Sequence, residues 1–331
     1  MQPLLKWAGG KRQLLPALRE HYPRDCDRYI EPFLGSGAVF FDLYSSGRLR
    51  DRRVRLVDLN ADVVGCYVML RDETEAVIRA LDLLKREHEA RGDACYYDVR
   101  DRRFNPLRSA VPAVYTPELA AMLIYLNRTG FNGLFRLNRR GDFNVPAGRY
   151  VNPRILDSDH LRAVARAFQA DGVSIECAPF EQTLADAGVG DFVYCDPPYV
   201  ALSRTASFAH YTAGGFTSAD HLRLQQAVIA AARRGAAVVV SNSSAEDAAI
   251  AYGSQAAQAA GLNVSRVPAR RLINSNASRR GPVEELIVSN TRGPIQAGAL
   301  KDSRHSVMGQ RRLRMARRDA DLVTKTRRKT G

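Results

Sequence analysis

The sequence lacks the cysteine spacing of a zinc site or of a disulfide framework. It contains five cysteines in 331 residues, and no two of them form a C-x-x-C pair. We interpret them as free core thiols in a protein of a reducing compartment, and we expect no bound metal ion. The cysteines are Cys26, Cys66, Cys95, Cys177 and Cys195.

Long hydrophobic runs are also missing. No stretch reaches the roughly 18 apolar residues that a membrane-spanning helix requires, which excludes that class of protein. The first residues do not form a secretion signal, because Gly9, Gly10 and Lys11 interrupt their apolar pattern. No internal repeat is visible. We expect a cytoplasmic protein that makes no membrane contact.

Positive charge is in excess, with a net charge of +14. Such an excess indicates an anionic polymer as partner. The charge is uneven, since residues 301–331 carry eleven Lys and Arg against three Asp, which leaves +6 on the first 300 residues. We expect residues 291–331 to be a basic tail with little order, because the hydrophobic pattern ends there. This tail is either a solvated end or an arm that contacts phosphates.

Short β-branched runs alternate with helical patterns through most of the chain. This alternation predicts an α/β fold with a mostly parallel sheet and helices on both of its faces. The predicted strands are Arg28–Phe33, Val54–Leu59, Val173–Ala178, Asp191–Cys195, Ala236–Asn242, Asn263–Val267 and Glu284–Ser289. The predicted helices among them are Ala38–Ser46, Asn60–Met69 and Ser218–Arg234.

The alternation stops between residues 70 and 170. There the pattern predicts helices at Thr74–Ala90 and Thr116–Asn127, followed by a loop rich in Arg, Asn and Gly. Thr116 is the expected N-cap of the second helix, with Pro117 in its first turn. We expect a sheet domain made of residues 1–69 and 171–290. Residues 70–170 would be inserted into it as a second, mainly helical domain without a buried strand.

A glycine-rich turn follows the first predicted strand, in Y-I-E-P-F-L-G-S-G at residues 29–37. Gly35 and Gly37 allow a sharp bend and a close approach to a ligand. Asp58 ends the next strand, twenty-one residues after Gly37, where a carboxylate can accept both hydroxyls of a ribose. The strand, the helix and the acid at this distance together favour nucleotide binding over an ordinary tight turn.

A second strand ends in V-Y-C-D-P-P-Y, residues 193–199. Its two prolines forbid continuation of the strand, so an acidic side chain and a free carbonyl lie side by side at its carboxyl end. Open α/β sheets bind ligands at that edge. Asp196 and the Pro197 carbonyl can accept the two N–H bonds of a planar base, with Tyr199 stacked on its ring. The alternative is a proline-rich turn that only caps the strand.

Two further segments carry candidate ligand contacts. P-L-L-K-W-A-G-G-K, residues 3–11, places a glycine pair before a helix, where Lys11 can reach an anionic group. The only tryptophan, Trp7, lies here, and a core anchor is its alternative role. Residues 125–150 mix Arg and Asn with aromatic residues on a Gly-rich frame. These side chains can read base edges or wedge into a base stack, whereas the alternative is a solvated polar loop.

In this order the four segments resemble the adenine-N6 DNA methyltransferases of the Dam type, over roughly residues 3–290. The shared motifs are L-K-W-A-G-G-K, E-P-F-x-G-x-G, D-x-N, N-R-x-G-x-N-G-L-x-R, G-x-F-N-V-P-x-G-R-Y and D-P-P-Y. The resemblance implies a Rossmann-like, S-adenosylmethionine-dependent methyltransferase fold with an inserted target-recognition domain. It implies a nucleoid-associated monomer that methylates N6 of an adenine flipped out of duplex DNA, within GATC. A cognate restriction endonuclease is a candidate partner, and an orphan or phage enzyme is the alternative.

The resemblance also implies roles for individual residues. The implied catalytic residues are Asp196, Pro197 and Tyr199, with no Ser, Cys or His nucleophile. The implied cofactor contacts are Trp7, Lys11, Glu31, Phe33, Gly35, Gly37, Asp58 and Asp196. The implied DNA contacts are Lys6, Phe131, Asn132, Leu134, Arg136, Asn138, Pro146 and Tyr150, with Arg136 reading a guanine. We expect residues 200–216 to form a mobile lid over the flipped base.

The sequence departs from the family pattern at a few positions. Phe131 stands where the Dam type usually has the Tyr that wedges into the duplex, and Phe135 and Leu137 also differ. The basic tail is not a family feature. Related D-P-P-Y enzymes methylate ribosomal RNA, cytosine N4 or protein glutamine, but Asp196 disfavours cytosine and the Arg- and Asn-rich insert disfavours a protein substrate. The intact D-P-P-Y disfavours a catalytically silent DNA-binding protein.

Overall fold

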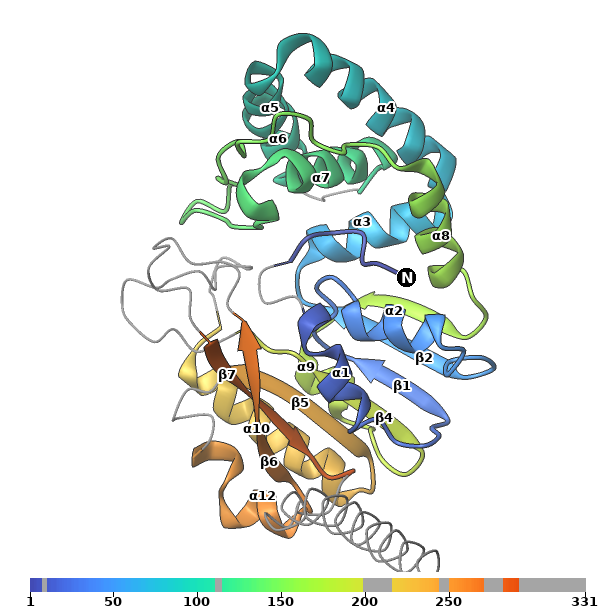
Figure 1. Cartoon of the computed structure of the whole chain (residues 1–331), viewed down its shortest axis with the longest axis vertical. Coiled ribbons are helices and arrows are strands. Elements are labelled where there is room, and N and C mark those ends of the chain that lie inside the picture. The colour runs from blue at the N-terminus through green and yellow to red at the C-terminus, as the bar shows by residue number, and fades with distance from the viewer. Residues whose placement is uncertain (8–10, 111–114, 199–215, 244–249, 271–281, 292–331) are drawn as a thin grey trace, which may run out of the picture. The chain divides into compact units, whose positions relative to one another are not determined.

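A seven-stranded sheet with helices on both faces forms the centre of the computed structural model (Figure 1). The structure describes residues 1–7, 11–110, 115–198, 216–243, 250–270 and 282–291. Residues Met1–Thr291 belong to one compact unit. The α/β fold predicted from the alternation of strands and helices is confirmed.

The sheet has the strand order β3-β2-β1-β4-β5-β7-β6. The first five of these strands pair in parallel, whereas β7 is antiparallel to both β5 and β6. All seven predicted strands are confirmed, with ends that shift by a few residues. They are β1 (Arg28–Glu31), β2 (Arg53–Asp58), β3 (Val173–Cys177), β4 (Asp191–Cys195), β5 (Ala237–Ser243), β6 (Asn263–Arg270) and β7 (Pro282–Ser289).

Each face of the sheet has its own hydrophobic core. Along β4, Phe192 and Tyr194 face one core, whereas Val193 and Cys195 face the other. A strand buried on both faces is typical of a parallel sheet covered by helices. The helices over the first face are α1 (Leu15–Arg19), α2 (Ala38–Ser45) and α3 (Ala61–Asp72), and those over the second are α9 (Phe180–Leu184), α10 (Ser218–Arg233) and α12 (Gln255–Ala259).

Side-chain caps explain where several helices begin. Asn60 accepts hydrogen bonds from the backbone N–H groups of the first turn of α3. Thr116 does the same for α7 (Pro117–Thr129), which confirms the predicted cap. Thr217 and Asp220 form a reciprocal capping box at α10. Each cap satisfies backbone donors that have no partner within the helix.

The order in which the strands are added to the sheet changes direction between β1 and β4. Strands β2 and β3 lie on one side of β1, and β4 and β5 lie on the other. This is a topological switch point, where open α/β sheets bind ligands beyond the carboxyl ends of their strands. The glycine-rich turn after β1 and the D-P-P segment after β4 therefore meet at this edge.

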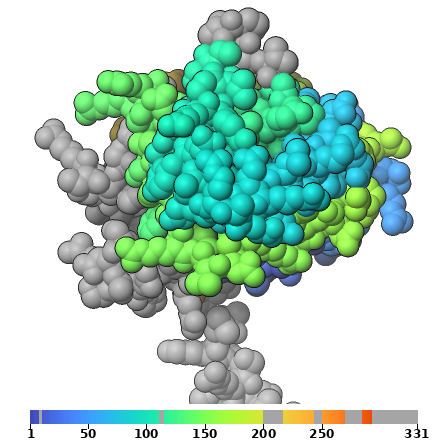
Figure 2. All heavy atoms as spheres, turned by 90° about the horizontal axis from the view of Figure 1, so that it is seen from above, coloured from blue at the N-terminus to red at the C-terminus, as the bar shows by residue number. Residues whose placement is uncertain are grey.

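Residues 70–170 fold mainly as helices, as predicted. Helix α7 is buried along most of its length and packs against α3 and α4. Within the described part of this segment we find isolated bridges but no strand. Seen from above, its teal and green atoms make up most of the described surface (Figure 2). The elements besides α7 are α4 (Thr74–Arg91), α5 (Asp93–Asp98), the π-helical turn η2 (Val99–Phe104), α6 (Asn105–Arg108), the 3₁₀ turn η3 (Phe131–Gly133) and α8 (Ser158–Phe168).

Some expectations fall on residues that the structure does not describe. Tyr199, the expected lid except for Phe216, and the tail beyond residue 291 lie outside the described residues. Among those described, no helix is both long and apolar enough to cross a membrane. The same residues contain no group of three or more side chains arranged to hold a metal ion.

Candidate active site

Polar side chains gather where the carboxyl ends of β1, β2, β4 and β5 meet. Glu31 ends β1, Asp58 ends β2, Asp196 directly follows β4, and Ser241 lies near the end of β5. The 3₁₀ turn η1 (Lys11–Gln13) brings Lys11 to the same edge. Residues from segments far apart in the sequence are thus brought together at the switch point.

Asp196 and Lys11 form an ion pair that is largely withdrawn from water. Lys11 Nζ lies 2.7 Å from Asp196 Oδ1, and their side chains are 3% and 23% exposed. Burial raises the pKa of the Asp196 carboxyl, whereas the Lys11 ammonium and the Ser241 hydroxyl lower it. A desolvated carboxylate needs such partners to stay ionised. The pair therefore keeps a charged hydrogen-bond acceptor at the end of β4.

Two prolines follow Asp196 and end the strand. Pro197 is buried and Pro198 is half-buried. Because proline has no N–H group and a fixed φ, the pairing of β4 with its neighbours cannot continue through them. The strand therefore ends at Cys195, and the backbone that carries the Pro197 carbonyl is restrained by the two proline rings directly after Asp196.

Asp58 holds the glycine-rich turn after β1. Its Oδ2 accepts the Gly35 N–H at 2.8 Å, and its Oδ1 accepts the Asn60 N–H at 2.9 Å. Burial raises the pKa of Asp58, against the lowering effect of these backbone donors. Gly35 has a φ of +46°, and a Cβ on it would lie 2.9 Å from the indole Nε1 of Trp7. The turn therefore requires glycine at this position.

Glu31 is only 2% exposed. Its Oε2 accepts a hydrogen bond from the Tyr29 hydroxyl at 2.9 Å, and the carboxyl also accepts one from the Phe40 backbone in the first turn of α2. Burial raises the pKa of Glu31 well above its ordinary value, although both hydrogen bonds lower it. The side chain thus ties the end of β1 to α2, across the glycine-rich turn. Phe33, in that turn, stacks on Phe180 with ring centroids 5.6 Å apart.

Trp7 lies between the glycine-rich turn and the helical segment. One edge of its indole faces Gly35, as the close approach of Nε1 shows. Its ring also stacks with Phe135, with centroids 6.0 Å apart and planes at 26°. Phe135 immediately precedes Arg136, a predicted DNA contact. Trp7 therefore connects a predicted cofactor turn to a predicted DNA-reading segment.

Several predicted DNA contacts lie on the turn after α7 and on the loop that pairs with it. The Phe131 N–H donates to the Pro146 carbonyl at 2.9 Å, so the two residues are neighbours. Phe131 is 45% exposed, although its ring is large and apolar. Asn132 is exposed in a left-handed conformation, with a φ of +54°, whereas Leu134 packs against the core. The projecting Phe131 ring suits the predicted wedge into a base stack.

Lys6 and Tyr150 stand together beside this turn. Lys6 Nζ lies 4.6 Å from the centroid of the Tyr150 ring and 3.5 Å from its hydroxyl. Lys6 is exposed, and Tyr150 is 40% exposed. The ring face attracts the ammonium and holds it near the predicted DNA surface.

The buried side chain of Asn127 joins the N-terminal segment to the same turn. Its Oδ1 accepts the Lys6 N–H, and its Nδ2 donates to the carbonyls of Lys6 and Gly133, at 2.8 to 2.9 Å. Gly133 has a φ of +62°, and a Cβ there would collide with the Lys6 side chain. Motif analysis gave Asn127 no role, because the backbone groups that it binds come from distant parts of the chain.

Arg136 is half-buried and held in one orientation by Asn144. Its Nε donates to Asn144 Oδ1 at 2.8 Å, and one terminal nitrogen donates to the Asn144 carbonyl at 3.2 Å. Asn138 is used differently, since its Oδ1 accepts the backbone N–H groups of Arg140 and Asp142. In the free protein the Asn138 side chain therefore closes a turn. Sequence reasoning missed Asn144, although it lies within a motif of the same segment.

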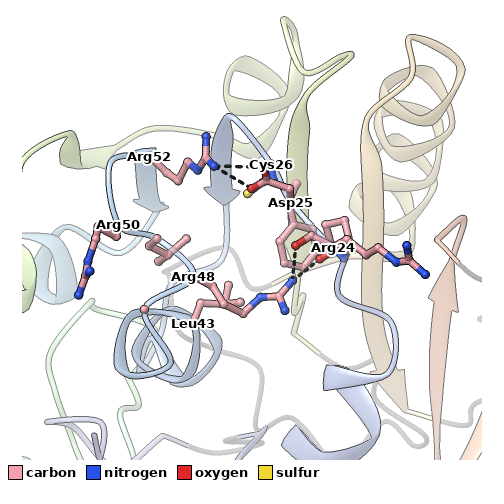
Figure 3. A pocket seen from close by; sticks show the side chains of 11 residues that line it. Arg24, Asp25, Cys26, Leu43, Arg48, Arg50 and Arg52 are labelled. Atoms are coloured by element: carbon pink, nitrogen blue, oxygen red, sulfur yellow. Dashed lines mark hydrogen bonds and ion pairs between the residues drawn. The ribbon is translucent and has the colours of Figure 1, made fainter.

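A pocket of about 190 Å³ opens at the other edge of the sheet, before β1 and β2 (Figure 3). It is rich in arginine, but two of these side chains are engaged with neighbours. Arg48 donates to the Pro23 and Arg24 carbonyls, and Arg52 pairs with Asp25. The pocket also lies at the amino ends of the strands, where open α/β sheets do not bind ligands. It is therefore separate from the site described above.

Comparisons with known proteins show a family and several relatives that this chain resembles. A family described as D12 class N6 adenine-specific DNA methyltransferase matches residues 7–265. The Type II methyltransferase M1.LlaDCHI of Lactococcus lactis is 34% identical over 290 residues, covering 88% of this chain and 95% of that protein. M.MjaIII of Methanocaldococcus jannaschii, also a Type II methyltransferase, is 36% identical over 300 residues, covering 88% and 99%. The DNA adenine methylase of Escherichia coli is 34% identical over 288 residues, covering 86% and 93%.

Proposed function

Because this chain belongs to the D12 class N6 adenine-specific DNA methyltransferases, we propose that it acts on an adenine flipped out of duplex DNA, within GATC. Its fold is the Rossmann-like fold of S-adenosylmethionine-dependent methyltransferases. The observation that carries the proposal is the Asp196 carboxylate, held by Lys11 at the switch point and followed by two prolines. A flipped purine amine is the substrate group that matches this acceptor.

The residues at the sheet edge fit S-adenosylmethionine. The chain bends sharply at Gly35, where a φ of +46° favours glycine, and Asp58 ends the neighbouring strand, where its carboxylate suits the hydroxyls of a ribose. Trp7 and Phe33 supply aromatic surface beside the same turn. When bound, S-adenosylmethionine supplies a methyl group on a positively charged sulfur.

The chain contributes orientation and fixed charge to the reaction. The adenine amine is a poor nucleophile, because its lone pair is delocalised into the ring. Asp196 and the Pro197 carbonyl accept both N6 hydrogens, which draws the nitrogen towards tetrahedral geometry and directs its lone pair at the methyl carbon. With the donor bound, N6 would receive its methyl group, and the bonding electron pair would remain with the departing sulfur. The proton that N6 then loses already points at Asp196, which is placed to accept it.

Residues 70–170 serve as the target-recognition domain in this proposal. The exposed Phe131 ring fills the gap left by the flipped adenine, and Arg136 reads a guanine of the site. Lys6, Asn132, Leu134, Asn138, Pro146 and Tyr150 complete the contacts. GATC follows from the resemblance of the motifs to the Dam type, and the relatives named DNA adenine methylase support adenine in DNA as the target.

The enzyme acts as a monomer on one strand at a time in this proposal. The relatives named Type II methyltransferase support a restriction–modification setting, in which a cognate endonuclease is the partner. An orphan or phage enzyme is the alternative. The basic tail adds phosphate contacts whose strength falls with salt.

Transfer of labelled methyl to three substrates in parallel tests the proposal. We expect label on a GATC duplex, and none on single-stranded RNA, on protein, or on a duplex in which one base pair of GATC is changed. Nucleoside analysis of the product should place the label on N6 of adenine. Label on cytosine or on carbon would refute the mechanism, and equal labelling of both duplexes would refute the site.

Replacement of Asp58 by Asn should weaken cofactor binding about fivefold. The amide oxygen still accepts the Gly35 N–H, but the amide NH2 group cannot accept the Asn60 N–H, and the charge is lost. A charge-assisted hydrogen bond is about twice as strong as a neutral one. Fluorescence of Trp7, the only tryptophan, reports the binding directly because its indole faces the same turn. Unchanged affinity in a folded variant would remove Asp58 from the cofactor site.

A further inference from the structure

The register of the sheet places Ser241 beside Asp196. Strands β4 and β5 pair in parallel, with Tyr194 opposite Val239 and Cys195 opposite Val240. Continuing this register by one residue sets Asp196 opposite Ser241. Since alternate residues of a strand share a face, Tyr194, Asp196 and Ser241 lie on the same face of the sheet.

These three side chains form a continuous hydrogen-bonded chain. The Ser241 Oγ donates to Asp196 Oδ1 at 3.2 Å, and the hydroxyls of Tyr194 and Ser241 lie 2.9 Å apart. Ser241 is 0% exposed and Tyr194 is 1% exposed. Water therefore cannot replace either hydroxyl without opening the core.

The direction of the hydrogen bonds follows from the number of protons. An ionised carboxylate only accepts hydrogen bonds, so Ser241 must donate its single hydroxyl proton to the hydrogen bond with Asp196. Ser241 then accepts from Tyr194, which keeps its proton because burial raises the pKa of the Tyr194 hydroxyl well above its ordinary value. Chains of this kind polarise each member in the same sense and strengthen the terminal bond.

Resting on the function proposed above, we propose that Ser241, itself held by Tyr194, is the positioning residue for the Asp196 carboxylate. Ser241 and Lys11 both bind the same oxygen of Asp196, Oδ1. This fixes the carboxylate rotation and directs Oδ2 to the amine of the substrate. Ser241 touches neither the base nor the donor and acts only through Asp196.

The groups that interact electrostatically with Asp196 come from four segments. They are Lys11 from the N-terminal segment, Glu31 from β1, Tyr194 and, on the opposite face of the sheet, Cys195 from β4, and Ser241 from β5. The ammonium and the serine hydroxyl favour the ionised carboxylate, whereas burial disfavours it. Loss of the Ser241 hydroxyl should therefore raise the pKa of Asp196, so that methylation is lost at a higher pH as the solution is acidified.

The test compares single-turnover methylation of a GATC duplex by full-length variants across a pH series, at saturating DNA and cofactor. We expect Ser241→Ala to reduce the rate about tenfold at neutral pH, the size of one hydrogen bond to a charged group. The acidic limb of its profile should move to higher pH, while cofactor affinity stays as in the wild type. Ser241→Thr should restore both the rate and the position of the acidic limb of the pH–rate profile to those of the wild type. Tyr194→Phe should also move the acidic limb to higher pH, but by a smaller amount than Ser241→Ala.

A matched control comes from the neighbouring strand. Ser289 in β7 is also a buried serine, at 2% exposed, but its hydroxyl bonds to Thr291 and not to Asp196. Ser289→Ala should leave the acidic limb in place. Thermal melting of every variant corrects the rates for any loss of folded protein.

An acidic limb in Ser241→Ala that matches that of Ser289→Ala would overturn the role of Ser241. A limb that moves in Ser241→Ala but not in Tyr194→Phe would overturn the part assigned to Tyr194. Carbon-13 NMR titration of the aspartate carboxyls needs no substrate. It therefore tests the effect of Ser241 on the pKa of Asp196 independently of the proposed methylation activity. If the wild type methylates no adenine, that titration still decides whether Ser241 controls Asp196.

Discussion

Replacing Asp196 by Ala is expected to slow methyl transfer several hundred-fold. By analogy with the loss of one oxyanion-hole donor, the carboxylate contributes about 3–4 kcal/mol to the transition state. The substitution also leaves the buried Lys11 ammonium without the carboxylate that lies 2.7 Å away. Single-turnover transfer of labelled methyl to a GATC duplex measures the effect.

Asp196→Asn is the matched variant. It keeps an oxygen that accepts one N6 hydrogen but removes the charge opposite Lys11, so its rate should fall between those of the wild type and Asp196→Ala. Both variants should melt as folded proteins in a thermal scan. Near-full methylation by a folded Asp196→Ala variant would show that the carboxylate does not drive the reaction.

Replacing Arg136 by Ala is expected to relax the choice of base at one position of the site. A bidentate arginine–guanine pair discriminates by about 1–3 kcal/mol, or roughly 5- to 150-fold in relative rate. Asn144 holds the guanidinium through Nε and one terminal nitrogen, so the side chain is oriented before DNA arrives. The measurement is the ratio of methylation rates on GATC and on duplexes that each carry one substituted base pair.

Arg139→Ala supplies the control for this experiment. Arg139 is an exposed arginine in the same hairpin. We expect its removal to weaken binding to all duplexes alike and to reduce the salt dependence, as loss of a phosphate contact does. If Arg136→Ala also lowered methylation equally on every sequence, its assignment as a base reader would be wrong.

Local chemistry made much of the fold predictable. The cap at Thr116 and the two prolines that end β4 act through neighbouring residues, so the sequence alone predicts them. The cap at Asn60 is equally local, but the predicted helix included Asn60. Part of the candidate site was also predictable, because the glycine-rich turn and the D-P-P segment each lie at the carboxyl end of their own predicted strand. The topology rule for open sheets then brings those ends together.

Contacts between distant segments were beyond reach of the sequence. Nothing in the local pattern shows that β7 lies between β5 and β6, because antiparallel pairing at a sheet edge depends on which strands find each other. Ser241 is a small polar residue that follows three valines in β5. Its proposed role depends on the register between β4 and β5, which places it opposite Asp196 and which the sequence does not show.

The hydrogen bonds of the buried Asn127 side chain affect how the two ligands bind. Three hydrogen bonds from one buried amide fix the backbone that precedes Trp7 to the turn that presents Phe131, so neither segment shifts without the other. A ligand that orders one segment therefore also orders the other, and a second ligand then binds with a smaller loss of conformational entropy. We expect the methyl donor and the duplex to enhance each other's affinity by one common factor, since such linkage is reciprocal.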